Sequence, residues 1–75
     1  MDPQLLILMA AFIEDEVRLD SSLTEDLGMK QADLEALAEA INQTYNVHIQ
    51  RTEIIPAYFD TVESLQHFIA RKQAE

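Results

Sequence analysis

The sequence predicts an all-α domain: a small irregular four-helix bundle with three main helices, one short helix and a long loop after the first helix. Apolar residues recur at helical spacing, capping patterns precede several of these stretches, and the single glycine, Gly28, separates the long loop from the second helix. A length of 75 residues predicts one domain, residues 1–75. The chain has no cysteine, so neither disulfides nor thiolate metal sites support this small core.

The first helix is predicted from Gln4 to about Glu14. Asp2 is suited to cap its free amides, and Pro3 is tolerated at the first helical position. Acidic residues in 14–16 oppose the helix dipole, so the last turn should fray. This helix is apolar on nearly every side, which predicts either burial all round or a surface for a partner or a second copy. Its apolar residues are Leu5, Leu6, Ile7, Leu8, Met9, Phe12 and Ile13.

An extended, irregular loop is predicted from Val17 to Leu27. The pattern Ser22-Leu23-Thr24-Glu25 matches a capping box and predicts one short helical turn. Gly28 ends the loop. The apolar residues expected to anchor it in the core are Val17, Leu19, Leu23 and Leu27.

The second helix is predicted from about Lys30 to Tyr45. Its apolar residues follow steps of three and four, which define one helix face. Asn46 is a natural stop because asparagine tolerates the left-handed conformation, and 47–49 should cross back over the core. The face consists of Leu34, Leu37, Ala38, Ile41 and Tyr45.

The last third of the chain predicts two helices. The first is short and poorly defined by the sequence, and the second has a clear capping pattern. Between Thr52 and Phe59 at most one or two helical turns are expected, because Pro56 removes a backbone donor. Residues 60–63, Asp-Thr-Val-Glu, match a capping box. The last helix should run from Val62 to about Ala70 and be closed by basic residues that suit a helix C-terminus.

Several of these stretches carry a family resemblance. Glu25-Asp26-Leu27-Gly28 precedes the second helix, Val47-His48-Ile49 follows it, and Phe59-Asp60-Thr61-Val62 opens the last helix. In these features the chain resembles the acyl carrier proteins, over roughly residues 17–70. The resemblance implies the family's helical fold. It also implies a serine at the start of the second helix, within Asp-Ser-Leu, that carries 4′-phosphopantetheine.

The chain departs from the family at that motif. The three positions read Lys30-Gln31-Ala32, and Gln31 has no hydroxyl that could form the phosphoester. No cofactor is therefore expected, although the family's cofactor is 4′-phosphopantetheine. The acidic partner surface also differs, since Lys30, Ala36, Asn42 and Gln43 stand where acids are usual. Asp33 is retained, whereas Glu35 and Glu39 stand where apolar contact residues are usual. The expected partner-binding set is Asp33, Leu34, Glu35 and Glu39.

Other candidate sites have simpler interpretations. His48 and His67 have no partner at ligand spacing, and Asp20, Glu25 and Asp26 do not form a calcium-loop pattern. Ser64, in Glu-Ser-Leu, is expected to be a helix-surface serine, whereas Ser21 and Ser22 are expected in loop and capping roles. No catalytic set, metal site or phosphate loop is predicted, so the chain is expected not to be an enzyme.

Charge narrows the expected partners. Fourteen acids against five bases give a formal charge of −9, which disfavours nucleic acid and anionic membranes. Basic or mixed-surface protein partners are favoured. The apolar run Leu5–Ile13 is too short to span a bilayer and lacks a preceding basic stretch, so a cytoplasmic protein is expected.

The sequence therefore predicts an acyl-carrier-protein-like domain without the attachment serine. It would bind a protein partner, such as an enzyme of lipid, polyketide or peptide assembly. Two alternatives stay open at this point. One is a working carrier that uses another attachment site or binds acyl chains non-covalently. The other is an assembly module that dimerises through the apolar first helix.

Overall fold

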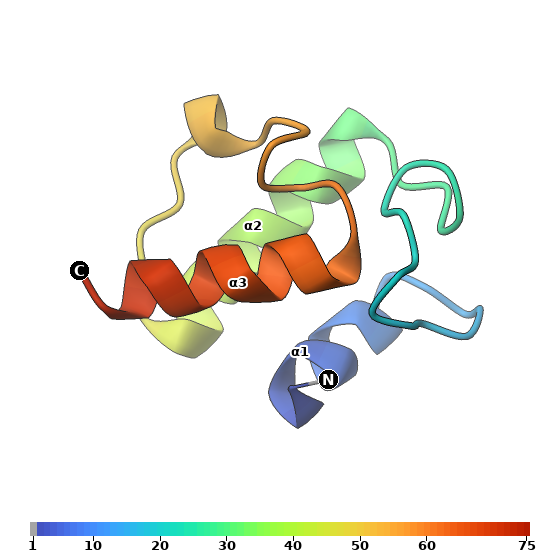
Figure 1. The fold of residues 1–75 in the computed structure, drawn as a ribbon, viewed down its shortest axis with the longest axis horizontal. Helices are drawn as coiled ribbons and strands as arrows, with labels where there is room; N and C mark the ends of the chain where they lie inside the picture. Colours follow the sequence, from blue (N-terminus) through green and yellow to red (C-terminus); the bar gives the residue numbers. More distant parts are fainter. Residues whose placement is uncertain (1) are drawn as a thin grey trace.

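Three α-helices and one short turn make up the fold of the computed structural model, which describes residues 2–75 (Figure 1). They are α1 (Pro3–Ala10), α2 (Gln31–Tyr45), the 3-10 turn η1 (Arg51–Glu53) and α3 (Val62–Gln73). The all-α class is confirmed. The predicted short helix within 52–59 is a single 3-10 turn centred slightly earlier in the chain. Within the described residues, the only extended pairing is one isolated bridge between Ser22 and Thr61.

Helix α1 begins as predicted but ends four residues early. The Asp2 carboxylate accepts a hydrogen bond from the Gln4 amide (3.0 Å), and Pro3 is the first helical residue. The helix stops at Ala10 rather than near Glu14. The amide of Ile13 donates to Met9 (2.9 Å) in a closing turn, and Ile13 packs against the core. The acids that follow Ile13 would oppose the dipole of a longer helix, which favours the early end.

The N-terminus of α1 is tied to the other two helices. The Tyr45 hydroxyl, at the end of α2, donates to the Asp2 carboxylate (2.7 Å), and the Asp2 amide donates to the Gln66 side chain of α3 (2.9 Å). Burial, followed by the bond to Asp2, raises the pKa of the Tyr45 phenol above its usual range. The phenol therefore remains a hydrogen-bond donor at neutral pH, and α1 is held in place at its first turn.

The long loop after α1 is ordered by backbone pairing with the start of α3. The Leu23 amide donates to the Asp60 carbonyl (2.8 Å), and the Val62 and Glu63 amides donate to the carbonyls of Ser21 (3.0 Å) and Leu19 (2.9 Å). The bonds from Val62 and Glu63 satisfy donors at the start of α3 that otherwise have no partner within the helix. Leu23 is completely buried, while the other predicted anchors (Val17, Leu19 and Leu27) are partly buried against the core.

The capping box predicted at the start of α3 is shifted by one residue, whereas the cap predicted in the loop lies at Ser22 as expected. The Thr61 hydroxyl, rather than Asp60, accepts from the Ser64 amide (3.1 Å) at the start of α3. In the loop, the Ser22 hydroxyl accepts from Glu25 (3.2 Å), but Asp26 supplies the carboxylate that accepts from the Ser22 amide (2.7 Å). The pairing of the loop with residues 60–63 fixes the position of Thr61, which sequence spacing does not encode. The Asp26 amide also donates to the Ser22 carbonyl (3.1 Å), so the single helical turn predicted at Ser22 is present.

Helix α2 matches its prediction closely. It ends at Tyr45, and Asn46 adopts the predicted left-handed conformation (φ 55°). Gly28 also has a positive φ of 67°, which turns the chain from the loop into α2. Helix α3 extends to Gln73, one turn beyond its predicted end.

One core joins all of these elements. Its completely or almost completely covered apolar side chains come from every helix, from the loop and from the segment around η1. They are Leu5, Met9, Leu23, Met29, Leu34, Leu37, Ala38, Ile41, Ile49, Ile54, Phe59, Val62, Leu65, Phe68 and Ile69. Among residues 2–75, the helices are too short or too polar to cross a membrane.

Candidate functional site

The start of α2 is shaped by the turn at Gly28 and by a side-chain cap. Met29 is buried, and its amide donates to the Leu23 carbonyl (2.9 Å), which fixes the end of the loop. The Asp33 carboxylate accepts from the Lys30 amide (3.0 Å) and so closes the first turn. Gln31 is exposed as the first residue of α2, where the resemblance places the carrier serine. Its amide is a hydrogen-bonding group, not a nucleophile.

The four predicted partner-binding residues do not all share one surface. Leu34 is 6% exposed and packs in the core, so its side chain is not part of the outer face of α2. Asp33 is exposed but its carboxylate already caps the helix. Glu35 is partly buried and Glu39 is exposed one turn further along. The two glutamates, four residues apart, therefore form the accessible acidic pair of α2.

A groove of about 340 Å³ lies beside these two glutamates. Its far wall is the segment from Ile49 to Ile54, which the Asn42 side chain holds by accepting from the Ile49 amide (2.7 Å) and donating to its carbonyl (3.2 Å). From the sequence, Asn42 was expected only on the outer face of the helix, and its two hydrogen bonds to Ile49 were not predicted. The groove is lined by Glu35, Ala36, Ala38, Glu39, Asn42, Ile49, Arg51 and Ile54.

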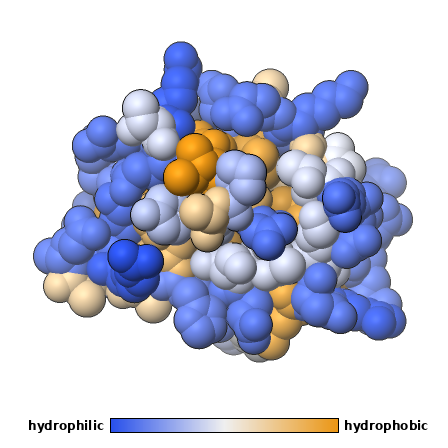
Figure 2. All heavy atoms as spheres, turned by 45° about the horizontal axis from the view of Figure 1, so that its top comes forward, coloured by the Kyte–Doolittle hydropathy of each residue, from blue (hydrophilic) through white to orange (hydrophobic). Residues whose placement is uncertain are grey.

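Arg51 places one positive charge at this groove. Its guanidinium lies 3.3 Å from the Glu35 carboxylate, and its side chain is 81% exposed. Exposed ion pairs of this kind contribute about 0–1 kcal/mol, so a partner cation can replace Arg51 at little cost. The face drawn in Figure 2 is largely hydrophilic, and its apolar atoms lie in small separate areas. The groove beside α2 is lined by Glu35, Glu39 and Arg51 next to the apolar Ile49 and Ile54, so it is suited to polar recognition with a narrow apolar contact.

The η1 turn is attached to α3 by a second ion pair. Lys72 lies 2.8 Å from the Glu53 carboxylate, and the Lys72 side chain is only 11% exposed. A hydrogen bond from the Gln50 amide and the contact with Lys72 hold the pKa of Glu53 below its usual range. The same contact with Glu53 raises the pKa of Lys72. The ion pair between Glu53 and Lys72 therefore fixes the far wall of the groove beside α2 to the C-terminal turns of α3.

We expect this ion pair to stabilise the fold at neutral pH and to fail in acid. The folded pKa of Glu53 is depressed, so its contribution is present above the unfolded pKa and is lost as pH falls through the folded value. Glu53→Gln should therefore lower Tm at neutral pH and have little effect in acid. Thermal unfolding across this range tests the prediction, with Glu14→Gln as an exposed control. A Tm difference that stays constant with pH would contradict it.

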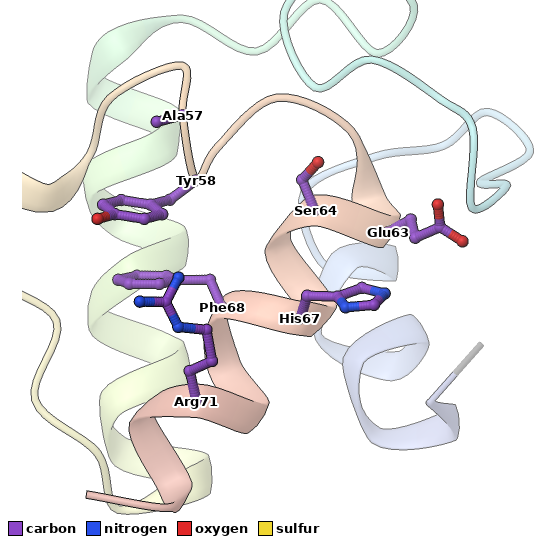
Figure 3. Close-up of a pocket in the computed structure, with 7 residues that line it drawn as sticks. All are labelled: Ala57, Tyr58, Glu63, Ser64, His67, Phe68 and Arg71. Atoms are coloured by element: carbon purple, nitrogen blue, oxygen red, sulfur yellow. The ribbon is translucent and has the colours of Figure 1, made fainter.

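A second groove lies between α3 and the residues before it (Figure 3). The rings of Tyr58 and Phe68 stack with centroids 4.3 Å apart, and the Arg71 guanidinium lies 5.9 Å from the Tyr58 centroid. Ser64 and His67 also line this groove, but Figure 3 shows their side chains pointing in different directions. The Ser64 hydroxyl instead accepts from the Thr61 hydroxyl (3.1 Å) in the first turn of α3. This groove therefore contains no hydrogen-bonded serine–histidine pair.

The other candidate residues, the two histidines and the acids of the loop, do not form a common site. His48 and His67 are both exposed, and Asp26 is engaged in the turn at Ser22. Within residues 2–75, no three His, Cys, Asp or Glu side chains gather where they could hold a metal ion.

No protein-family model matches the chain, and no curated protein matches it at a significant level. The functional interpretation therefore depends on the residues and geometry of the chain itself.

Proposed function

We propose that this chain is an acyl-carrier-protein-like, irregular helical bundle that lacks the prosthetic-group serine and acts as a non-catalytic protein-binding module. The observation that carries the proposal is the position of Gln31. It is the exposed first residue of α2, directly after the Glu-Asp-Leu-Gly turn, where the resemblance requires a serine. The order of elements supports the resemblance: a helix, a long loop, the principal helix α2, a short turn and a last helix.

The start of α2 still has the features that suit a phosphodiester. Helix-end amides and the helix dipole favour an anion there. The attachment chemistry, however, needs a hydroxyl oxygen that becomes part of the phosphoester, and a carboxamide does not supply one. Loss of this group while the preceding turn is retained favours a role in binding over a role in acyl transfer.

The partner-binding surface in this proposal consists of Glu35, Glu39 and the groove beside them. Helix α2 carries three acids and no basic residue, so the partner presents lysine or arginine. The partner in this proposal is an enzyme of lipid, polyketide or peptide assembly in the cytoplasm, because such enzymes recognise the corresponding surface of the acyl carrier proteins that the chain resembles. Displacement of the exposed Arg51 would leave Glu35 free to pair with the incoming cation.

The test is to identify the partner and then reverse the charge of the surface. A photo-crosslinking residue at Ala36, which is exposed between the two glutamates, would capture the partner in the source cells for mass spectrometry. We expect Glu35→Lys/Glu39→Lys to weaken the affinity for that partner by about tenfold or more, because attraction becomes repulsion. Circular dichroism should remain unchanged.

Glu63→Lys/Glu75→Lys is the matched control, since it makes the same change in net charge at exposed positions of α3 and the C-terminus. It should alter the affinity far less. Equal losses in the two double variants would mean that only overall charge matters. An unchanged affinity in the α2 variant would remove this surface from the proposal.

A further inference from the structure

Helix α1 has one buried face and one uncovered apolar face. Leu5 and Met9 are completely buried against the core. On the opposite side, Ile7 is 73% exposed and Leu6 is 44% exposed. We call this uncovered side the α1 face, and its residues follow the i, i+3, i+4, i+7 spacing of one helix side: Pro3, Leu6, Ile7 and Ala10.

This exposure is not the result of a loose helix end. The first turn of α1 is held by Asp2, which is bonded to Tyr45 of α2 and Gln66 of α3. The last turn is held by the bonds from Phe12 (3.0 Å) and Ile13 (2.9 Å) back to Met9. The α1 face is therefore presented on a helix that is fixed at both ends. Such a preformed face loses little conformational entropy when a second helix docks on it.

The charges around the α1 face indicate what kind of molecule covers it. Residues 3–13 contain no charged side chain, whereas Asp2 lies at one end and Glu14, Asp15 and Glu16 follow at the other. Arg18 pairs with Glu16 (3.2 Å), and this exposed pair leaves two uncompensated acids at that end. A second copy of this chain, with its own formal charge of −9, would place acid against acid in either orientation. A segment with basic ends would instead be attracted.

We propose that the α1 face is a second docking surface, which takes an amphipathic helical segment of a protein partner, apolar along one side and carrying lysine or arginine at both ends. Ala10 is small enough to let that helix approach closely. Figure 1 shows α1 at the lower end of the molecule and η1, which borders the α2 groove, at the upper end. The two surfaces are accessible at the same time. The chain can therefore connect two partners.

The probe is a synthetic amphipathic helical peptide with leucines along one side and two lysines at each end, labelled with a fluorophore. Binding is measured by fluorescence anisotropy, and the site is mapped from amide NMR shifts. We expect the shifts to centre on α1 and the affinity to fall as salt rises. Ile7→Gln should weaken binding by about tenfold. Ile7 is largely exposed in the free chain and would be buried in the complex, and a glutamine gains much less from that burial.

Two comparisons separate this surface from the others. Ile55→Gln removes another exposed isoleucine (41% exposed) away from α1 and should leave the affinity unchanged. Glu35→Lys/Glu39→Lys should also leave the α1 shifts unchanged, so failure here is distinct from failure of the α2 surface. Equal binding of a peptide with glutamates in place of the lysines would overturn the proposal. So would a dimer that strengthens with salt in sedimentation and is lost in Ile7→Gln, because a second copy would then cover the face.

Discussion

Leu23→Ala should cost about as much stability as a substitution in the middle of a helix, about 2–5 kcal/mol, although Leu23 lies in the loop. Its side chain is completely buried, as is that of Leu37 at the centre of α2. Its amide also anchors the loop to Asp60 (2.8 Å). For a chain of this size the total free energy of unfolding is about 4–11 kcal/mol, so the loss removes a large part of it. Urea denaturation followed by circular dichroism measures the change.

Two further variants show whether the loss comes from the core. Leu37→Ala should give a loss similar to that of Leu23→Ala, since both remove a completely buried leucine. Ile55→Ala, at an exposed apolar position, should change stability by about 0.5 kcal/mol or less. If Leu23→Ala behaves like Ile55→Ala, the loop does not belong to the core as the structure shows it.

Introducing the acyl-carrier motif should allow the prosthetic group to be attached. The triple variant Lys30→Asp/Gln31→Ser/Ala32→Leu rebuilds Asp-Ser-Leu at the start of α2, and all three positions are exposed, so the core is unaffected. Co-expression with a broad-specificity phosphopantetheinyl transferase should add the prosthetic group to the new hydroxyl. The effect is all or none: a phosphoester forms only where an oxygen nucleophile is present. Intact mass spectrometry of the purified variant gives the result.

Lys30→Asp/Ala32→Leu, with glutamine kept at position 31, is the matched control and should gain no mass. The triple variant should fold like the unmodified chain by circular dichroism. A folded triple variant that stays unmodified, beside a carrier converted in the same cells, would show that the turn and α2 are not presented as in an acyl carrier protein.

Much of the fold is predictable because local signals agree with the tertiary contacts. The apolar spacing from Leu34 to Ile41 predicted the buried face of α2, and Asn46 predicted its end. The end of α1 was predicted too late, because Ile13 turns back to the core rather than continuing the helix. The cap of α3 was predicted one residue too early, at Asp60 rather than Thr61, because pairing between distant segments fixes the register. Such pairings are not encoded in local spacing.

The candidate sites depended more strongly on tertiary structure. Sequence patterns predicted Glu35 and Glu39 as partner contacts, but they did not show that Asn42 and Arg51 lie with them around one groove. Leu34 was expected both in the core and at the partner surface, and the structure places it in the core. For α1, the uniform apolar composition favoured a core helix whose spare face the following loop would cover, and the exposure of Leu6 and Ile7 shows that this expectation was wrong. Only the packing of Leu5 and Met9 shows that the opposite side, with Ile7, is uncovered.

The central proposal is that this chain is an acyl-carrier-protein-like domain that does not carry the prosthetic group. The most direct measurement is the intact mass of the unmodified chain after co-expression with a broad-specificity phosphopantetheinyl transferase, beside a known carrier converted in the same cells. We predict no change in mass, because Gln31 offers no hydroxyl where the attachment serine is required. A gain equal to the prosthetic group would contradict the claim, and fragmentation would then test Ser64, Ser22 and Ser21 in that order.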